Sequence, residues 1–201
     1  MNVVCMDLEG VFIPEIWIKV AEITGIEKLK LTTREISDYN KLMTMRIDTM
    51  NEHGLKMADI QNAISQMDPL PGAVEFIKWV RNRAPLIILS DTFEQFAAPL
   101  LEKLTYPTIF CNTLTISEKG VIEDFHIRLQ DGKRKTAEAF KNLNFKVVAS
   151  GDSYNDITML KVADKGVLFR PPQNIIDEYP EIPVAESYEE LKPLFLEAFI
   201  A

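Results

Sequence analysis

Five short apolar runs most constrain what this chain can fold into. Each contains several β-branched or other apolar residues, as strands do. The runs are residues 3–6, 86–89, 108–111, 146–149 and 167–169. They are largely continuous rather than alternating, which favours a sheet covered on both faces. Because amphipathic segments lie between them, at 73–83, 93–104 and 133–143, the pattern predicts an α/β fold with a doubly wound, mostly parallel sheet.

Residues 14–71 interrupt this alternation, because their apolar periodicity predicts helices only. The helices expected there span residues 15–24, 37–53 and 57–66. The segment 68–72, with two prolines and a glycine, would return the chain to the next strand–helix unit. We therefore expect a helical cap of residues 14–71, inserted after the first strand of a core built from 1–13 and 72–201. The sequence of residues 115–129, with Gly120 near its middle, predicts a small β-hairpin.

The composition indicates a globular protein and narrows its partners. The chain has 201 residues, of which 47% are hydrophobic and 26% are charged, enough for a sizeable core. Its net charge of −8 disfavours binding to a nucleic-acid backbone or to an anionic membrane. A small anionic substrate stays compatible with this charge, because a bound metal ion can reverse the local field.

The two cysteines, Cys5 and Cys111, lie in apolar runs and are expected to be buried thiols rather than a disulfide. The N-terminus lacks the basic and apolar regions of a signal peptide, and no run approaches the roughly 20 apolar residues of a membrane span. A cytoplasmic location is therefore expected.

Polar residues follow three of the expected strands at the point where each strand ends. They are Asp7 and Glu9 after the first strand, Ser90, Asp91 and Thr92 after the second, and Asp152, Asn155 and Asp156 after the fourth. Lys133 would begin the helix that precedes the fourth strand. Because the carboxyl ends of parallel strands share one edge of the sheet, these groups should meet there.

Such a set of side chains favours phosphoryl transfer. Three carboxylates, those of Asp7, Asp152 and Asp156, offer the hard oxygen ligands that suit Mg²⁺, and without a metal they would repel a phosphate. The Ser90 hydroxyl and the backbone N–H groups of a strand-to-helix turn at Asp91 and Thr92 can hold phosphate oxygens. Lys133 can neutralise charge on both the nucleophile and the phosphate.

Asp7 can attack phosphorus and form an aspartyl phosphate, while Glu9 protonates the leaving oxygen and then activates water. Taken alone, each of these residues has a more ordinary interpretation as a turn cap, a helix N-cap or a solvated lysine. Their order, each at its own strand end or helix start, argues against coincidence.

These residues, in this order, resemble the motifs of the haloacid dehalogenase superfamily over nearly the whole chain. Asp7-Leu8-Glu9-Gly10-Val11 resembles the first motif, Ser90 the second, Lys133 the third and Gly151-Asp152-x-x-Asn155-Asp156 the fourth. The resemblance implies that Asp7 is the nucleophile. It also implies that Mg²⁺ binds the Asp7 carboxylate, the Glu9 backbone carbonyl and Asp152, with Asp156 in support.

The helical insertion and the hairpin resemble the phosphoserine phosphatase branch of that superfamily, in which a Glu and an Arg of the cap clamp the amino acid. Glu15 matches the first and is expected to bind the ammonium, and Arg46 matches the second and is expected to pair bidentately with the carboxylate. Tyr39, two helical turns before Arg46, stands where the branch has an aromatic residue. Asn155 completes the expected substrate contacts.

Within that branch, several segments resemble the bifunctional phosphoserine phosphatase/homoserine phosphotransferase proteins. They are Asp-Leu-Glu-Gly-Val from residue 7, Ile-Pro-Glu-Ile-Trp from 13, Ser-Asp-Thr-Phe from 90 and Gly-Asp-Ser-Tyr-Asn-Asp from 151. Compared with ordinary members of the branch, Glu9 replaces an Asp, and Asp91-Thr92 replaces two glycines. These departures leave the choice between water and an alcohol as acceptor open.

The expected function is therefore Mg²⁺-dependent hydrolysis of phosphoserine, with homoserine as an alternative acceptor. A phosphatase for another small metabolite, such as a sugar phosphate, is a rival that Glu15 and Arg46 disfavour. A non-enzymatic phospho-acceptor module is a second rival, but it would need neither a large cap nor a proton donor at Glu9. His53 and His126 fall in the cap and the hairpin and do not suggest a histidine mechanism. A homodimer is compatible with the sequence but is not determined by it.

Overall fold

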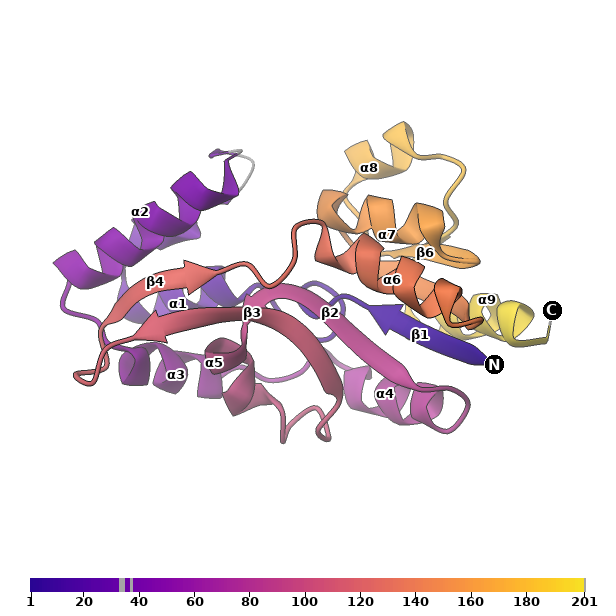
Figure 1. Cartoon of the computed structure of the whole chain (residues 1–201), viewed down its shortest axis with the longest axis horizontal. Helices are drawn as coiled ribbons and strands as arrows, with labels where there is room; N and C mark the ends of the chain where they lie inside the picture. Colours follow the sequence, from indigo (N-terminus) through magenta and orange to yellow (C-terminus); the bar gives the residue numbers. More distant parts are fainter. Residues whose placement is uncertain (33–34, 37, 201) are drawn as a thin grey trace.

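The protein is described by a computed structural model covering residues 1–32, 35–36 and 38–200. Its centre is a seven-stranded sheet in the order β4-β3-β2-β1-β5-β6-β7 (Figure 1). The strands are β1 (Asn2–Met6), β2 (Leu86–Phe93), β3 (Thr108–Ile116), β4 (Ile122–His126), β5 (Lys146–Gly151), β6 (Lys165–Phe169) and β7 (Val184–Ala185). All neighbouring strands pair in parallel except β3 and β4, which form an antiparallel hairpin. This confirms the predicted α/β fold with its mostly parallel sheet.

The strand β1 lies in the middle of the sheet, between β2 and β5. Its last residue, Met6, pairs with Ile88 of β2 on one side and with Ser150 of β5 on the other. The chain therefore leaves β1 at the point where the strand order reverses, which is where open α/β sheets bind their ligands.

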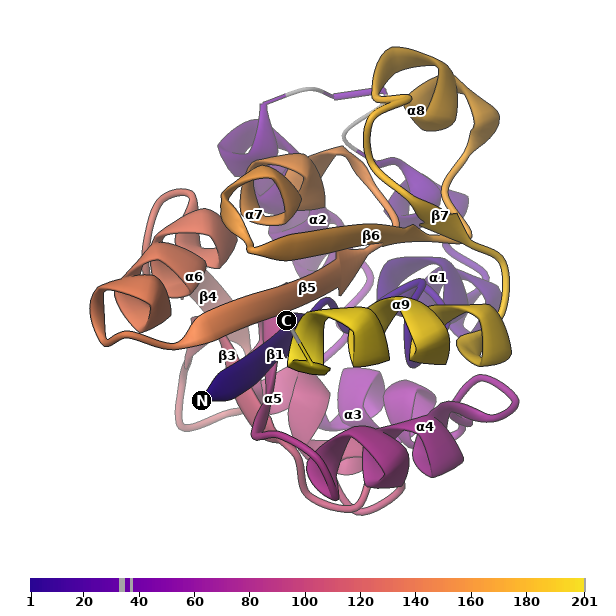
Figure 2. The ribbon, with the colours of Figure 1, turned by 90° about the vertical axis from the view of Figure 1, so that its right-hand side faces the viewer.

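Helices cover both faces of the parallel part of the sheet (Figure 2). On one face lie α6 (Gly132–Asn142) and α7 (Ile157–Val162), and on the other lie α4 (Ala73–Arg81) and α9 (Tyr188–Ile200). Alternate residues of β1 enter the two hydrophobic clusters, Val3 and Cys5 on the α6 side and Val4 and Met6 on the α4 side. This explains why the strand is apolar throughout rather than at every second position. Both cysteines are buried free thiols, as predicted.

The described part of the segment 14–71 consists of helices and their connections. These are α1 (Ile16–Thr24), the 3₁₀ helix η1 (Glu27–Lys30), α2 (Tyr39–Glu52) and α3 (Met57–Ser65). The expected start of the second helix, Ser37, lies outside the described residues, and the helix begins at Tyr39 after Asp38, whose carboxylate accepts the Lys41 N–H at 3.1 Å. In Figure 1 these helices lie at one end of the molecule, and α6, α7 and α8 (Gln173–Glu178) lie towards the other.

The hairpin packs against this helical segment as well as against the sheet. The Met57 N–H donates to the Gly120 carbonyl at 2.8 Å, and the Asn51 side chain donates to the Ile122 carbonyl at 3.2 Å. The boundary between a cap of residues 14–71 and a core of 1–13 and 72–201 stays a prediction, but these contacts tie the two parts together beside the hairpin.

Three expectations about individual elements are corrected. The second strand does not end at residue 89 but continues to Phe93, because it bulges between the pairs Leu89–Phe110 and Phe93–Asn112. The helix expected at 93–104 is reduced to α5 (Glu94–Ala97) and the 3₁₀ helix η2 (Ala98–Leu100), where Pro99 cannot donate the backbone hydrogen bond of a longer helix. The strand 108–111 and the first strand of the hairpin are one continuous strand, β3.

None of the helices in the described ranges combines the length and the apolar character needed to cross a membrane.

Candidate active site

Asp7 is the first residue after β1, and the neighbouring strand holds it in place. Its backbone N–H donates to the Ser150 carbonyl of β5 at 3.0 Å, and its Oδ1 accepts the Leu8 N–H at 2.7 Å. The residue is only 4% exposed. The central position of β1 therefore delivers a buried carboxylate to the carboxyl edge of the sheet, as the sequence predicted.

Lys133, in the first turn of α6, joins two of the predicted carboxylates. Its Nζ lies 2.8 Å from Asp7 Oδ1 and 2.8 Å from Asp156 Oδ1. Lys133 is 4% exposed, so the three charged groups are buried together. This arrangement brings the start of α6, the end of β1 and the segment after β5, far apart in the chain, to one point.

Asp156 shapes the loop that follows β5. While its Oδ1 pairs with Lys133, its Oδ2 accepts the backbone N–H groups of Asp152 at 3.1 Å and Ser153 at 3.2 Å. The Asp152 carboxylate comes against Gly10 of the turn after β1, where an added Cβ would lie 2.3 Å from Asp152 Oδ2. Gly10 also has a φ of +70°, so this position requires glycine on two grounds.

The carboxylates of Asp7, Asp152 and Asp156 form a cluster that could hold a metal ion. One oxygen from each lies within 4.8 Å of the others. Burial raises the pKa of Asp7 well above its usual range, and the charge of Asp156 raises it further despite Lys133. Burial, followed by the charges of Asp156 and Glu15, raises the pKa of Asp152 to about 7.

These shifts have a simple electrostatic cause. Burial lowers the pKa of Lys133, but the charges of Asp156 and Asp7 outweigh it and raise the pKa well above 10.5. The carboxylates thus stabilise the charged form of Lys133, but its single positive charge cannot neutralise three carboxylates. An all-oxygen donor set with excess negative charge fits a hard divalent cation such as Mg²⁺.

The predicted phosphate-binding residues Ser90, Asp91 and Thr92 lie on the bulge of β2, not on a strand-to-helix turn. Ser90 and Thr92 are buried, and the Ser90 Oγ accepts the Thr92 N–H at 3.2 Å. The bulge turns the Asp91 carbonyl out of the sheet ladder, so it accepts hydrogen bonds from the Tyr39 hydroxyl at 3.0 Å and from the Asn112 side chain at 2.9 Å.

The Asp91 carboxylate also has a partner. Its Oδ2 accepts the Nδ2 of Asn155 at 2.9 Å. Asp91 therefore links the β2 bulge, the loop after β5 and helix α2. Sequence reasoning missed Asn112, which completes this network from β3. An asparagine within an apolar strand was the available signal.

Glu9 lies apart from the acidic cluster, at the N-terminus of α1. Its carboxylate accepts the Ile16 N–H at 2.8 Å, where the helix has unsatisfied donors. Burial raises its pKa to about 8, and the charge of the neighbouring Glu15 adds to this shift, while the Ile16 N–H opposes it. The Glu9 backbone carbonyl as a metal ligand stays a prediction.

Arg46 reaches the same region from α2 and is only 6% exposed. Its guanidinium lies 4.4 Å above the ring of Trp17, and its Nη2 donates to the Leu31 carbonyl at 2.8 Å. Within the described part of the chain its buried Nε has no hydrogen-bond partner, which is costly for a charged group. Burial lowers the pKa of Arg46 to about 10. Trp17, the platform for this side chain, was not predicted as a site residue.

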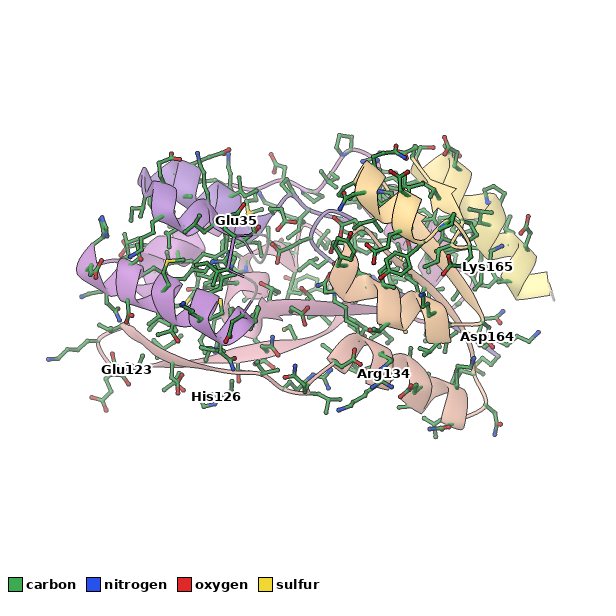
Figure 3. All side chains as sticks on the ribbon, turned by 90° about the horizontal axis from the view of Figure 1, so that it is seen from above. Glu35, Glu123, His126, Arg134, Asp164 and Lys165 are labelled. Atoms are coloured by element: carbon green, nitrogen blue, oxygen red, sulfur yellow. The ribbon has the colours of Figure 1, made fainter. Side chains whose placement is uncertain are left out.

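A cleft of about 870 Å³ connects these groups. Its lining includes Glu9, Glu15, Tyr39, Arg46, Asp91, Thr92, Lys133 and Asn155. The cluster of Asp7, Asp152 and Asp156 adjoins the cleft at Lys133. Neither histidine lines this cleft: His53 follows the last residue of α2, and His126 lies on β4 along the outer edge of the hairpin with Glu123 (Figure 3).

Comparisons with known proteins agree with this arrangement. A family model described as haloacid dehalogenase-like hydrolase matches residues 1–164. Phosphoserine phosphatase ThrH of Pseudomonas aeruginosa is 50% identical over 198 residues, which cover 98% of this chain and 97% of the relative. A phosphoserine phosphatase of Pseudomonas syringae is 49% identical, covering 98% of this chain and 84% of the relative.

The fold is also found among solved structures. The crystal structure of an apo phosphoserine phosphatase superposes with a TM-score of 0.77 at 22% identity, covering 96% of this chain and 97% of that one.

Proposed function

We propose, because this chain belongs to the haloacid dehalogenase-like hydrolases, that it is a Mg²⁺-dependent phosphatase that hydrolyses phosphoserine through a phosphorylated Asp7. The observation that carries this proposal is that two buried cationic side chains from different parts of the chain line one cleft. One is Lys133 of α6, which is paired with Asp7, and the other is Arg46 of α2, whose buried Nε has no hydrogen-bond partner among the residues that the structure describes. A substrate with a phosphate at one end and a carboxylate at the other would engage both. The names of the relatives that share half of the sequence support the same substrate.

In the first step, an oxygen of Asp7 attacks phosphorus, and the bond from phosphorus to the serine oxygen breaks. Lys133 positions the Asp7 carboxylate through its Oδ1 and stabilises the negative charge of the phosphoryl group. A Mg²⁺ ion held by Asp7 and Asp152, with Asp156 in support, would supply further charge stabilisation when bound. The Ser90 hydroxyl and the β2 bulge at Asp91 and Thr92 would contact the phosphate oxygens.

Glu9 would move the proton in both steps. With a pKa of about 8 it is protonated at neutral pH, so it can give its proton to the serine oxygen as that oxygen leaves. The resulting carboxylate then takes a proton from water as the water oxygen attacks phosphorus. Inorganic phosphate is released, and Asp7 and protonated Glu9 are restored.

The cap side of the cleft would select the amino acid. The Arg46 guanidinium offers a planar fork to the substrate carboxylate, and Glu15 offers a carboxylate to the ammonium. Tyr39 and Asn155, both bonded to Asp91, line the same cleft and would complete the contacts. A sugar phosphate has no carboxylate for Arg46 and no ammonium for Glu15. We infer that residues 14–71 act as a cap that closes over the substrate and limits water.

Homoserine is proposed as an alternative acceptor of the phosphoryl group. The cleft of about 870 Å³ is large enough for a second small amino acid beside the phosphorylated Asp7. The hydroxyl of homoserine would then replace water in the second step, with Glu9 taking its proton.

The test is turnover of L-phosphoserine by the purified protein with Mg²⁺, with and without homoserine, assayed for phosphate and phosphohomoserine. The same assay with a chelator tests whether turnover requires the metal. Glucose 6-phosphate and para-nitrophenyl phosphate, assayed in parallel, test the preference for phosphoserine. We expect Mg²⁺-dependent release of phosphate, with phosphoserine preferred over both comparison substrates. A preference for the sugar phosphate would overturn the substrate assignment. An acyl phosphate that persists without turnover would indicate a signalling module instead.

A further inference from the structure

Tyr188 makes a contact that the proposed mechanism does not use. It is the first residue of α9, and its hydroxyl donates to the Val11 carbonyl at 2.6 Å, across 177 positions of the chain. Val11 belongs to the turn that follows Asp7 and Glu9. The hydrogen bond is buried, and Tyr188 is 6% exposed, so water does not readily replace it.

The ring of Tyr188 is held from two sides. It stacks on Phe76 of α4 and on Phe169 of β6, with ring centroids 4.9 Å away in both cases. The guanidinium of Arg170 lies 5.6 Å from its centroid. Burial raises the pKa of Tyr188 to about 12, so the hydroxyl stays protonated and can donate at every pH at which the enzyme would work. The position of the donor is therefore set by contacts that do not involve the turn.

Both connections between the sheet and the helical segment pass this ring. Val11 lies on the connection that leaves the sheet after β1. Its neighbour Phe12 accepts, at its carbonyl, the N–H of Leu70 at 2.8 Å, and Leu70 lies on the connection that returns to the sheet. On the returning connection lies Gly72, where an added Cβ would be 3.1 Å from Tyr188 Cδ2. Gly72 has a φ of +86°, so the chain turns tightly against the ring at a position that favours glycine.

We propose that Tyr188 is a positioning residue, whose hydroxyl fixes the turn of residues 8–13 and so sets Glu9 relative to Asp7. The turn is closed on itself by the Phe12 and Ile13 N–H groups, which both donate to the Leu8 carbonyl. Tyr188 supplies a tie from this turn to α9. Tyr188 lies beyond residue 164, where the match to the family model ends. The expected effect of Tyr188 on catalysis rests on the proposed function, whereas its expected effect on the geometry of residues 8–13 does not.

The test is Tyr188→Phe, which removes the hydroxyl and keeps the stacked ring. We expect kcat to fall about tenfold with phosphoserine and by the same factor with para-nitrophenyl phosphate, because misplacing a reacting group acts on every substrate. KM for phosphoserine should change less than about twofold, since Arg46 and Glu15 are untouched. Hydrogen exchange of the Phe12, Ile13 and Leu70 amides should be about tenfold faster than in the wild type, while exchange in β5 stays unchanged.

Phe76→Leu is the matched control, because it removes one of the two stacked rings while Phe169 still holds the Tyr188 ring and the hydroxyl stays bonded to Val11. It should lower the melting temperature more than Tyr188→Phe does and leave kcat within about twofold of the wild type. If Tyr188→Phe keeps both the wild-type kcat and wild-type exchange in the turn, the positioning role is wrong. If kcat falls in both variants in proportion to lost stability, Tyr188 is only part of the core. If the wild type cleaves the aryl phosphate but not phosphoserine, the proposed substrate fails, while the exchange data still decide the role of Tyr188.

Discussion

The two walls of the cleft differ in how completely their charged groups are partnered. At the sheet edge, Lys133 bonds to Asp7 and Asp156 at 2.8 Å, and both oxygens of Asp156 have partners. On the cap side, the Arg46 Nε has no hydrogen-bond partner among the described residues. Contacts within the fold therefore position Lys133, Asp7 and Asp156, as catalysis of phosphoryl transfer requires, and the excess negative charge of this wall is left for a cation. The cap wall therefore has a hydrogen-bond donor available to a ligand, as recognition of a substrate requires.

The largest effect is expected at the sheet wall, from Asp7→Asn. An amide cannot form the acyl phosphate, so turnover of phosphoserine should fall by about 10⁴-fold or more, measured as phosphate release. The Asn side chain can still accept the Leu8 N–H, so circular dichroism should report a folded protein. Activity within tenfold of the wild type would remove Asp7 as the nucleophile and with it the catalytic role of this wall.

Lys133→Met tests whether the sheet wall is held together by its one ammonium group. Removing the cation leaves Asp7 and Asp156 buried without it, which should lower the free energy of unfolding by about 3–5 kcal/mol in urea titrations. The pKa of Lys133 is raised in the folded state, so its stabilisation is complete below pH 10.5 and is lost only as the pH rises through the folded value. The difference between the two proteins should therefore be largest below pH 10.5.

The exposed Lys135 of the same helix provides the control for this measurement. Lys135→Met should change the free energy of unfolding by less than about 0.5 kcal/mol. An equal loss in both variants would mean that the helix, and not the buried ion pairs, is responsible.

Arg46→Ala tests the cap wall, and here KM rather than kcat should respond. Losing a buried charged partner for the substrate carboxylate should raise KM for phosphoserine about 30-fold or more. The KM for para-nitrophenyl phosphate, which has no carboxylate, should change less than about twofold. Arg46→Lys should recover only part of the loss, because an ammonium lacks the planar fork. Equal effects on both substrates would exclude Arg46 from recognition of the amino acid.

The smallest effect is expected from Tyr39→Phe, which removes a hydrogen bond between the two walls. The hydroxyl donates to the Asp91 carbonyl at 3.0 Å, and this carbonyl keeps Asn112 as a second donor. The loss should be about 1 kcal/mol of stability in urea titrations, with a few-fold rise in KM for phosphoserine. Tyr106→Phe, at a tyrosine that is 67% exposed, should leave both quantities unchanged. A Tyr39→Phe variant identical to the wild type would mean that the walls are not coupled through Asp91.

Sequence reasoning was more successful at the sheet wall than elsewhere, and there are physical reasons for this. The continuous apolar runs specify strands buried on both faces, and parallel strands bring their carboxyl ends to one edge without further information. Asp7, Lys133, Asp152 and Asp156 could therefore be placed together before any coordinates. The bulge of β2 could not be predicted in this way, because it depends on the register with β3, which no local pattern encodes.

The cap wall and the C-terminal part of the chain depended more on tertiary contacts. Trp17 and Asn112 were missed because an aromatic on an amphipathic helix and an amide in a strand have many ordinary roles. The link from Tyr188 to Val11 joins residues 177 positions apart and has no sequence signature at all.

The sequence by itself determined the fold class, the family resemblance and the chemistry gathered at the end of β1, since periodicity and strand order act through the backbone. Only the tertiary structure decided how Glu9 meets the start of α1, how Asp91 is held from three elements and what supports the turn after Asp7. These features depend on distances between side chains from separate elements, and such distances exist only once the elements have packed.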